Sequence, residues 1–118
     1  MSANSQEYVE HVLEKLESME ALASGRFFGG TGISCRSVQF GMLMGNTLYF
    51  VVDEKTRPKY EAAGSSCFSY QTSKRKVFVH KYYEVPAEVF DDGKRFLECA
   101  RESIRAAEKL NKKRTKKK

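Results

Sequence analysis

Few residue types in this sequence could do chemistry, namely three cysteines, two histidines and one glycine-rich segment. Cys35, Cys67 and Cys99 are far apart and odd in number, which excludes a closed disulfide framework and leaves no CxxC pair for zinc or redox work. We therefore expect buried or half-buried free thiols. His11 and His80 have no second ligand at a spacing such as HExxH, so the sequence predicts no metal and no cofactor.

A catalytic nucleophile and base would have to come from His80 and a cysteine. His80 falls in a predicted strand among aromatic residues, and the sequence marks no partner for it. The pair Asp91-Asp92 is better explained as a helix cap than as two catalytic carboxylates. We predict that the protein is not an enzyme, whereas His80 beside Cys35 or Cys67 in an open cleft would favour catalysis.

The glycine-rich segment Gly29-Gly30-Thr31-Gly32 could in principle bring backbone N–H groups close to a phosphate. A Walker A loop would also need a Gly-Lys-Ser/Thr, and a dinucleotide fingerprint would need GxGxxG between a parallel strand and its helix. This segment has neither and precedes a predicted hairpin. It therefore predicts a turn or bulge rather than a nucleotide site.

Charge is concentrated at the C-terminal end of the chain. The 118 residues include 21 Lys and Arg against 15 Asp and Glu, a net charge of +6. Seven basic side chains and no acidic one lie in residues 109–118, so residues 1–108 carry 14 basic and 15 acidic groups. We expect residues 1–108 to form one domain and residues 109–118 to be a disordered basic tail.

A tail of this kind is available to polyanions such as DNA or RNA, which it would bind by counterion release without reading their sequence. The candidate nucleic-acid-binding residues are Lys112, Lys113, Arg114, Lys116, Lys117 and Lys118. The alternative is a tail that only increases solubility.

Capping residues and hydrophobic periodicity predict the helices and strands. The expected helices are 5–23, 56–63 and a long one after Asp91-Asp92, and the expected extended segments are 26–28 with 33–35, 38–44, 48–52, 67–70 and 76–85. Gly45-Asn46 predicts a two-residue hairpin turn, because both residues tolerate positive φ. The order α-β(3)-α-β(2)-α predicts a two-layer α+β domain with helices on one face of an antiparallel sheet.

The second face of this sheet also carries apolar residues. Apolar side chains occur in both alternation classes of the strands, which is more than one helical layer should cover. They are Val51, Phe78 or Val79, and the adjacent Tyr82 and Tyr83. We therefore expect a homodimer through the uncovered face or edge. No apolar run is long enough to span a membrane, and glutamates interrupt the N-terminal residues where a signal peptide would need an apolar stretch, so the expected location is the cytoplasm.

The segment Gly25-Arg26-Phe27-Phe28-Gly29-Gly30-Thr31-Gly32-Ile33 resembles the Arg-x-Phe-Gly-Gly-x-Gly signature of the TfoX/Sxy N-terminal domain family. The similarity continues through 38–44, Leu48-Tyr49-Phe50-Val51-Val52-Asp53, Phe68-Ser69-Tyr70 and Tyr82-Tyr83-Glu84-Val85-Pro86. The resemblance implies an α+β fold similar to secretion chaperones. It gives Arg26, Phe28, Gly29, Gly30 and Gly32 a structural role and supplies no catalytic residue.

The resemblance also implies a bacterial regulator linked to natural competence, the uptake of DNA in transformation. Longer members carry a second, helical domain, whereas this sequence continues into the lysine-rich tail. We expect a non-enzymatic regulatory module that contacts a protein partner, with non-specific nucleic-acid affinity from the tail. The alternative is a protein-interaction or chaperone-like adaptor that binds no nucleic acid.

Overall fold

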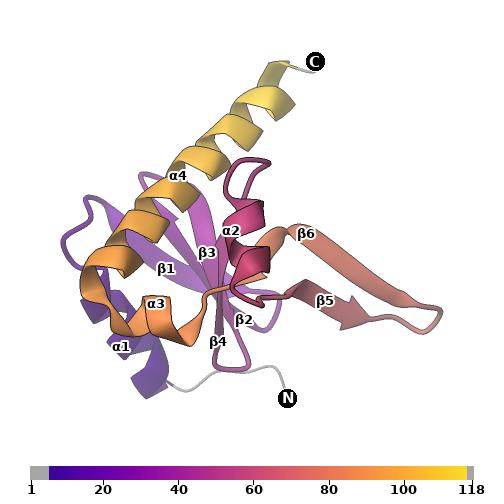
Figure 1. Ribbon diagram of the computed structural model, residues 1–118, viewed down its shortest axis with the longest axis horizontal. Helices are drawn as coiled ribbons and strands as arrows, with labels where there is room; N and C mark the ends of the chain where they lie inside the picture. The colour runs from indigo at the N-terminus through magenta and orange to yellow at the C-terminus, as the bar shows by residue number, and fades with distance from the viewer. Residues whose placement is uncertain (1–5, 117–118) are drawn as a thin grey trace.

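A six-stranded antiparallel sheet forms the centre of the computed structural model, which describes residues 6–116 and the side chains through residue 112 (Figure 1). The elements in chain order are α1 (Gln6–Lys15), β1 (Leu22–Phe27), β2 (Gly30–Cys35), β3 (Val38–Met44), β4 (Thr47–Val51), α2 (Arg57–Ala62), β5 (Cys67–Gln71), β6 (Lys76–Glu84), α3 (Ala87–Asp91) and α4 (Gly93–Lys116). The strand order is β1-β2-β3-β4-β6-β5. The predicted α+β class and antiparallel sheet are confirmed.

Two tight turns connect the first four strands. Gly45 and Asn46 have φ values of 56° and 66° between β3 and β4, which confirms the predicted hairpin. Phe28 and Gly29, with φ values of 48° and 84°, form a second turn of the same length between β1 and β2. Four strands therefore precede α2 instead of the predicted three, because residues 22–35 form two strands of a hairpin.

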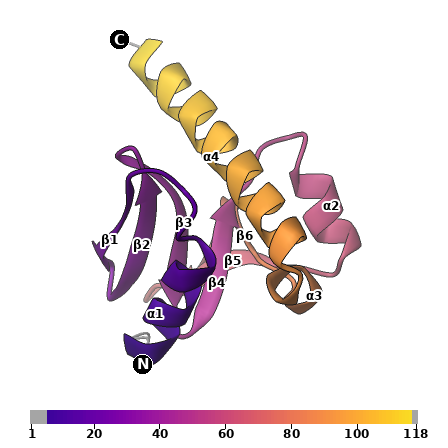
Figure 2. The ribbon, with the colours of Figure 1, turned by 90° about the vertical axis from the view of Figure 1, so that its left-hand side faces the viewer.

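The core lies between the sheet and α4, which runs diagonally across one side of the strands (Figures 1 and 2). Phe50 on β4 has its ring centroid 5.5 Å from Phe96 of α4 and 5.8 Å from Phe40 of β3. All three rings are fully buried. Because burial of apolar area is the dominant favourable term in folding, this aromatic cluster fixes α4 on the sheet.

A β-bulge in β3 changes which side chains reach this core. The register pairs Ile33 with Gly41 and Ser34 with Gln39, so Phe40 is an extra residue in β3. Phe40 packs toward α4, whereas Met42 lies with its partner Tyr49 on the opposite face. In a regular strand Phe40 and Met42 would share one face, and the bulge separates them.

The first helix is shorter than the predicted 5–23. It ends at Lys15, the segment that follows is held by turn hydrogen bonds such as Leu16 N to Leu13 O at 3.1 Å, and β1 begins at Leu22. Ala21 has a φ of 53°, a left-handed conformation that no helix continues through. Gly25 consequently lies within β1.

The last helix is longer than predicted. It continues through Lys116, so the helix does not give way to disorder at residue 109. Lys109 forms an ion pair with Asp53, with 3.0 Å between Nζ and Oδ2, and Leu110 packs against the core. Lysine and arginine are also good helix formers, which favours continuation of a helix already fixed by the core. Among residues 6–116, no helix is long and apolar enough to cross a membrane.

Candidate functional site

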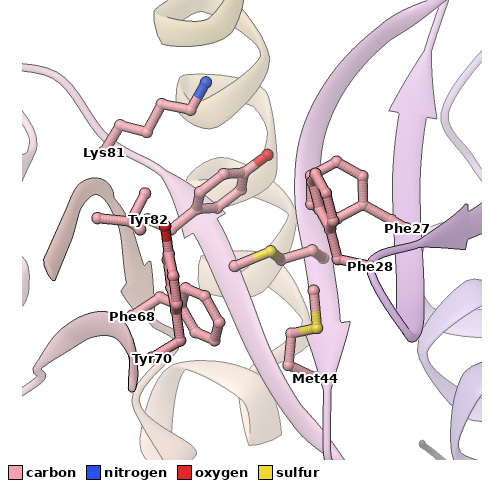
Figure 3. A pocket seen from close by; sticks show the side chains of 9 residues that line it. Phe27, Phe28, Met44, Phe68, Tyr70, Lys81 and Tyr82 are labelled. Atoms are coloured by element: carbon pink, nitrogen blue, oxygen red, sulfur yellow. The ribbon is translucent and has the colours of Figure 1, made fainter. Parts of the chain in front are cut away.

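The face of the sheet opposite α4 contains an apolar hollow with a volume of about 620 Å³ (Figure 3). Aromatic rings, two thioethers, one valine and one lysine line it, from Phe27, Phe28, Met42, Met44, Phe68, Tyr70, Val79, Lys81 and Tyr82. The volume lies within the range of small-ligand pockets, roughly 300–1,000 Å³. We call this site the hollow.

The two walls of the hollow come from opposite edges of the sheet. Phe27 and Phe28 belong to the β1–β2 hairpin, whereas Phe68 and Tyr70 lie on β5 at the other end of the strand order. Figure 3 shows the two aromatic pairs on either side, with Met44 between them. The sheet must curve strongly to bring its edges together, and two irregularities in register, at Ile33/Ser34 and Cys67/Phe68, allow it to bend.

Tyr82 is held in place by a hydrogen bond. Its hydroxyl accepts a 3.0 Å bond from the Nε2 of Gln39, and the ring is 5% exposed. Burial raises the pKa of this hydroxyl, so it remains protonated near neutral pH. Gln39 in turn lies over Gly32, where an added Cβ would be 2.5 Å from Oε1 of Gln39.

Gly30 leaves space for another residue of the hollow, Met44. A Cβ there would lie 2.2 Å from the backbone oxygen of Leu43 and 2.7 Å from the sulfur of Met44. Only a residue without a side chain permits this approach of β2 and β3. Gly30 and Gly32 therefore leave the space that Met44 and Gln39 occupy.

Phe28 is both strained and exposed. Its φ of 48° is a left-handed conformation that costs most residues about 1–2 kcal/mol, and its side chain is 86% exposed. The ring contacts Phe27 edge-on, with centroids 4.7 Å apart. A turn of this type favours Asn-Gly, so phenylalanine at this position destabilises the turn relative to asparagine.

A model of the TfoX N-terminal domain family matches residues 14–107. The chain belongs to the TfoX N-terminal domain family. A comparison with curated proteins finds no match to the sequence. The family match covers every element from β1 to the part of α4 that packs on the sheet, and thus all residues that line the hollow.

In this TfoX N-terminal domain, the signature residues lie in the β1–β2 hairpin beside the hollow. Phe28 and Gly29 form the hairpin turn, and Gly30 and Gly32 are the two glycines that admit neighbouring side chains. Arg26 lies on β1 opposite Thr31. The sequence did not predict that the same segment supplies one wall of the hollow, although the adjacent aromatics Phe27 and Phe28 were a signal.

Four of the six predicted nucleic-acid-binding residues lie on the last turns of α4, and Lys117 and Lys118 lie outside the described residues. Lys112 is exposed, and the side chains of Lys113, Arg114 and Lys116 lie outside the described residues. The backbone of residues 109–116 is helical and extends past the sheet (Figure 2). Cations at this end of a helix interact favourably with its dipole.

The chemistry-bearing residues of the domain are not gathered into a cluster. All three cysteines are free, with Cys35 and Cys99 buried and Cys67 half-buried, as predicted. Burial raises the pKa of the Cys99 thiol and so disfavours the reactive thiolate. His80 lies on β6, separated from Cys35 on β2 by β3 and β4, whereas Cys67 lies on the neighbouring strand β5, where its register partner is Tyr83. Within residues 6–116, no group of three His, Cys, Asp or Glu side chains could hold a metal ion.

Proposed function

We propose that this TfoX N-terminal domain is a regulatory module without catalytic activity, which acts by binding a protein partner through the hollow. Phe28 is the observation that carries the proposal. A strained residue persists where the surroundings or the function require it, and the exposed ring of Phe28 contributes little to the core. Its position at the rim suits it to pack against an apolar side chain inserted by the partner.

The residues that line the hollow support a protein partner. Aromatic residues and methionine are enriched at the centres of protein interfaces, and the lining consists mainly of these types. Lys81 is the one charged residue of the lining and lies at the edge (Figure 3). A partner segment that combines an apolar anchor with an acidic side chain would match both features.

Phe28→Asp tests the hollow, because aspartate is tolerated at a left-handed turn position and places a charge at the rim. The protein and its variant would each capture partners from nuclease-treated lysate of the native host, followed by mass spectrometry. Phe78→Asp is the matched control, since Phe78 is 53% exposed and does not line the hollow. A partner lost with Phe28→Asp and retained with the control supports the proposal, whereas equal capture by all three proteins contradicts it.

We also propose that the basic end of α4 adds non-specific affinity for nucleic acid. The test is a chain ending at Asn111, which removes residues 112–118 and keeps the ion pair of Lys109 and the packing of Leu110. The truncated chain should fold normally and lose most of its DNA retention near 50 mM salt, where electrostatic binding is strong. Unchanged retention would contradict a role for these lysines.

The second candidate function is an adaptor that binds protein through the hollow and binds no nucleic acid. Full-length protein would then show no DNA shift even at low salt. The expected cytoplasmic homodimer through the uncovered face or edge of the sheet stays a prediction. Sedimentation at micromolar concentration should give the mass of two chains, and a mass of one chain would contradict it.

A further inference from the structure

The β5–β6 hairpin is a second basic feature, separate from the end of α4. It extends away from the rest of the molecule (Figure 1). Residues 67–83 contain Lys74, Arg75, Lys76 and Lys81 and no acidic residue. All four side chains are exposed, and none takes part in the ion pairs found among the described residues.

The charge of the whole chain depends on these two features. Removing the seven cations of residues 109–118 and the four of the hairpin from the 21 basic residues leaves ten, against 15 acidic ones. The remainder of the protein is thus net negative. A polyanion would be repelled by the body and attracted to the hairpin and the helix end.

The outer face of the hairpin, which does not line the hollow, presents a flat ring among positive charges. Phe78 is 53% exposed, and its ring lies 6.2 Å from that of His80 with an angle of 23° between the planes. The Nζ of Lys76 lies 5.6 Å from the centroid of Phe78. Lys76, Phe78 and His80 alternate along β6 and are all exposed.

Hydrogen bonds to Thr72 fix the backbone at the tip of the hairpin. The hydroxyl of Thr72 accepts hydrogen bonds from the backbone N–H groups of Lys74 and Arg75 and donates one to the carbonyl of Arg75. The backbone N–H of Thr72 also donates to that carbonyl, at 2.9 Å. The loop therefore presents Lys74 and Arg75 next to the row of Lys76, Phe78 and His80.

From this arrangement we infer that the outer face of the β5–β6 hairpin binds single-stranded nucleic acid, with a base stacked on Phe78 and phosphates paired with Lys74, Arg75 and Lys76. Single-strand binders combine a basic path with exposed aromatic rings, and unpaired bases are free to stack where duplex bases are not. The structure buries Tyr82 and Tyr83 and leaves Phe78 exposed. The inference extends the proposed nucleic-acid affinity and does not depend on the end of α4.

The absence of tryptophan from the sequence allows a direct test of stacking. Phe78→Trp in the full chain places a single indole on the hairpin, and titration with a 15-nucleotide oligo(dT) should quench its fluorescence saturably. A 15-base-pair duplex should quench it much less. Phe28→Trp is the matched control, because it places a single exposed indole at the rim of the hollow and should not be quenched.

Affinity measurements complete the test. Phe78→Ala should weaken binding to oligo(dT) about ten-fold, in line with the loss of one base stack. The triple variant Lys74→Gln, Arg75→Gln and Lys76→Gln should reduce the salt slope by about two, at roughly 0.7 per single-strand phosphate contact. Each change should persist in the chain ending at Asn111, which separates this site from the end of α4.

The inference would be overturned by an unquenched Phe78→Trp together with unchanged affinity of Phe78→Ala. Equal competition by polyglutamate, without quenching, would also overturn it and would point to an acidic protein as the ligand. If the end of α4 does not bind nucleic acid, the affinity for DNA should be the same with and without residues 112–118. Phe78 variants should retain the wild-type thermal unfolding, because the ring is half exposed.

Discussion

The side-chain amide of Gln39 connects the signature segment to the hollow, since it lies over Gly32 and donates a 3.0 Å hydrogen bond to Tyr82. Gln39 is on β3, Tyr82 is on β6, and the two residues are 43 positions apart in the sequence. Gly32 provides the space in which the amide lies. A signature glycine and a tyrosine of the hollow are therefore parts of one arrangement.

The stability lost on alanine substitution at three glycines should depend on the space around each glycine. Gly30→Ala meets a backbone oxygen that cannot move alone, so we expect a loss of about 3 kcal/mol or more. Gly32→Ala displaces only the end of Gln39 and should cost about 1 kcal/mol, the worth of one hydrogen bond. Gly25→Ala is the control, because nothing lies within 4 Å of its Cβ. Urea unfolding of the three variants should give this order, and equal losses would contradict it.

The features that could be predicted from the sequence are those fixed by neighbouring residues. The Gly45-Asn46 turn, the helix at residues 57–62 and the free thiols follow from local backbone preference, capping and cysteine number. The α+β class follows from the order of these elements. Each depends on a few adjacent residues, so a single sequence was sufficient.

The hollow could not be predicted, because it depends on residues distant in the sequence. The bulge at Phe40 transfers Met42 to the other face, and no pattern within β3 distinguishes a bulged strand from a regular one. Curvature then brings Phe27 near Phe68 from opposite edges of the sheet. The ion pair between Lys109 and Asp53 was missed for the same reason, and the predicted tail began too early.

Phe28→Asn should separate stability from binding. Asparagine adopts the left-handed conformation more readily than phenylalanine and favours this turn, whereas the ring contact with Phe27 is lost. The two effects predict unchanged stability or a gain of up to about 1 kcal/mol. Thermal unfolding measures the change, and capture of the partner by the hollow should weaken. A clear loss of stability would contradict the strain assigned to Phe28.

Ser103→Ala should destabilise the domain, because Ser103 of α4 stabilises the bulge in β3. The hydroxyl of Ser103 is buried and donates a 2.6 Å hydrogen bond to the backbone oxygen of Phe40, a residue that the strand register leaves unpaired. Removing the donor leaves a buried carbonyl without this partner, at a cost of about 1–2 kcal/mol. Chemical denaturation should detect the loss. Ser69→Ala on the hairpin is the control and should leave stability unchanged.

The ion pair of Asp53 and Lys109 should make stability depend on acid pH. Burial alone would raise the pKa of Asp53, but hydrogen bonds from Lys109 and Thr56 lower it from 3.8 to about 2. Because the folded-state pKa is the lower one, the stabilisation is complete above pH 4 and is lost as the pH falls toward 2. Half of the Lys109 side chain is exposed, so solvent screening limits the contribution to about 1 kcal/mol.

Lys109→Met isolates this ion pair, since it leaves the contacts of Asp53 with Thr56 in place. The difference in unfolding free energy between wild type and variant should be present at pH 6 and disappear between about pH 4 and pH 2. Glu20→Gln removes the pair of Glu20 and Arg36, whose side chains are 78% and 62% exposed, and should give no measurable difference at either pH. A difference for Lys109→Met that stays constant from pH 6 to pH 2 would show that Lys109 stabilises the domain by packing and not by its charge.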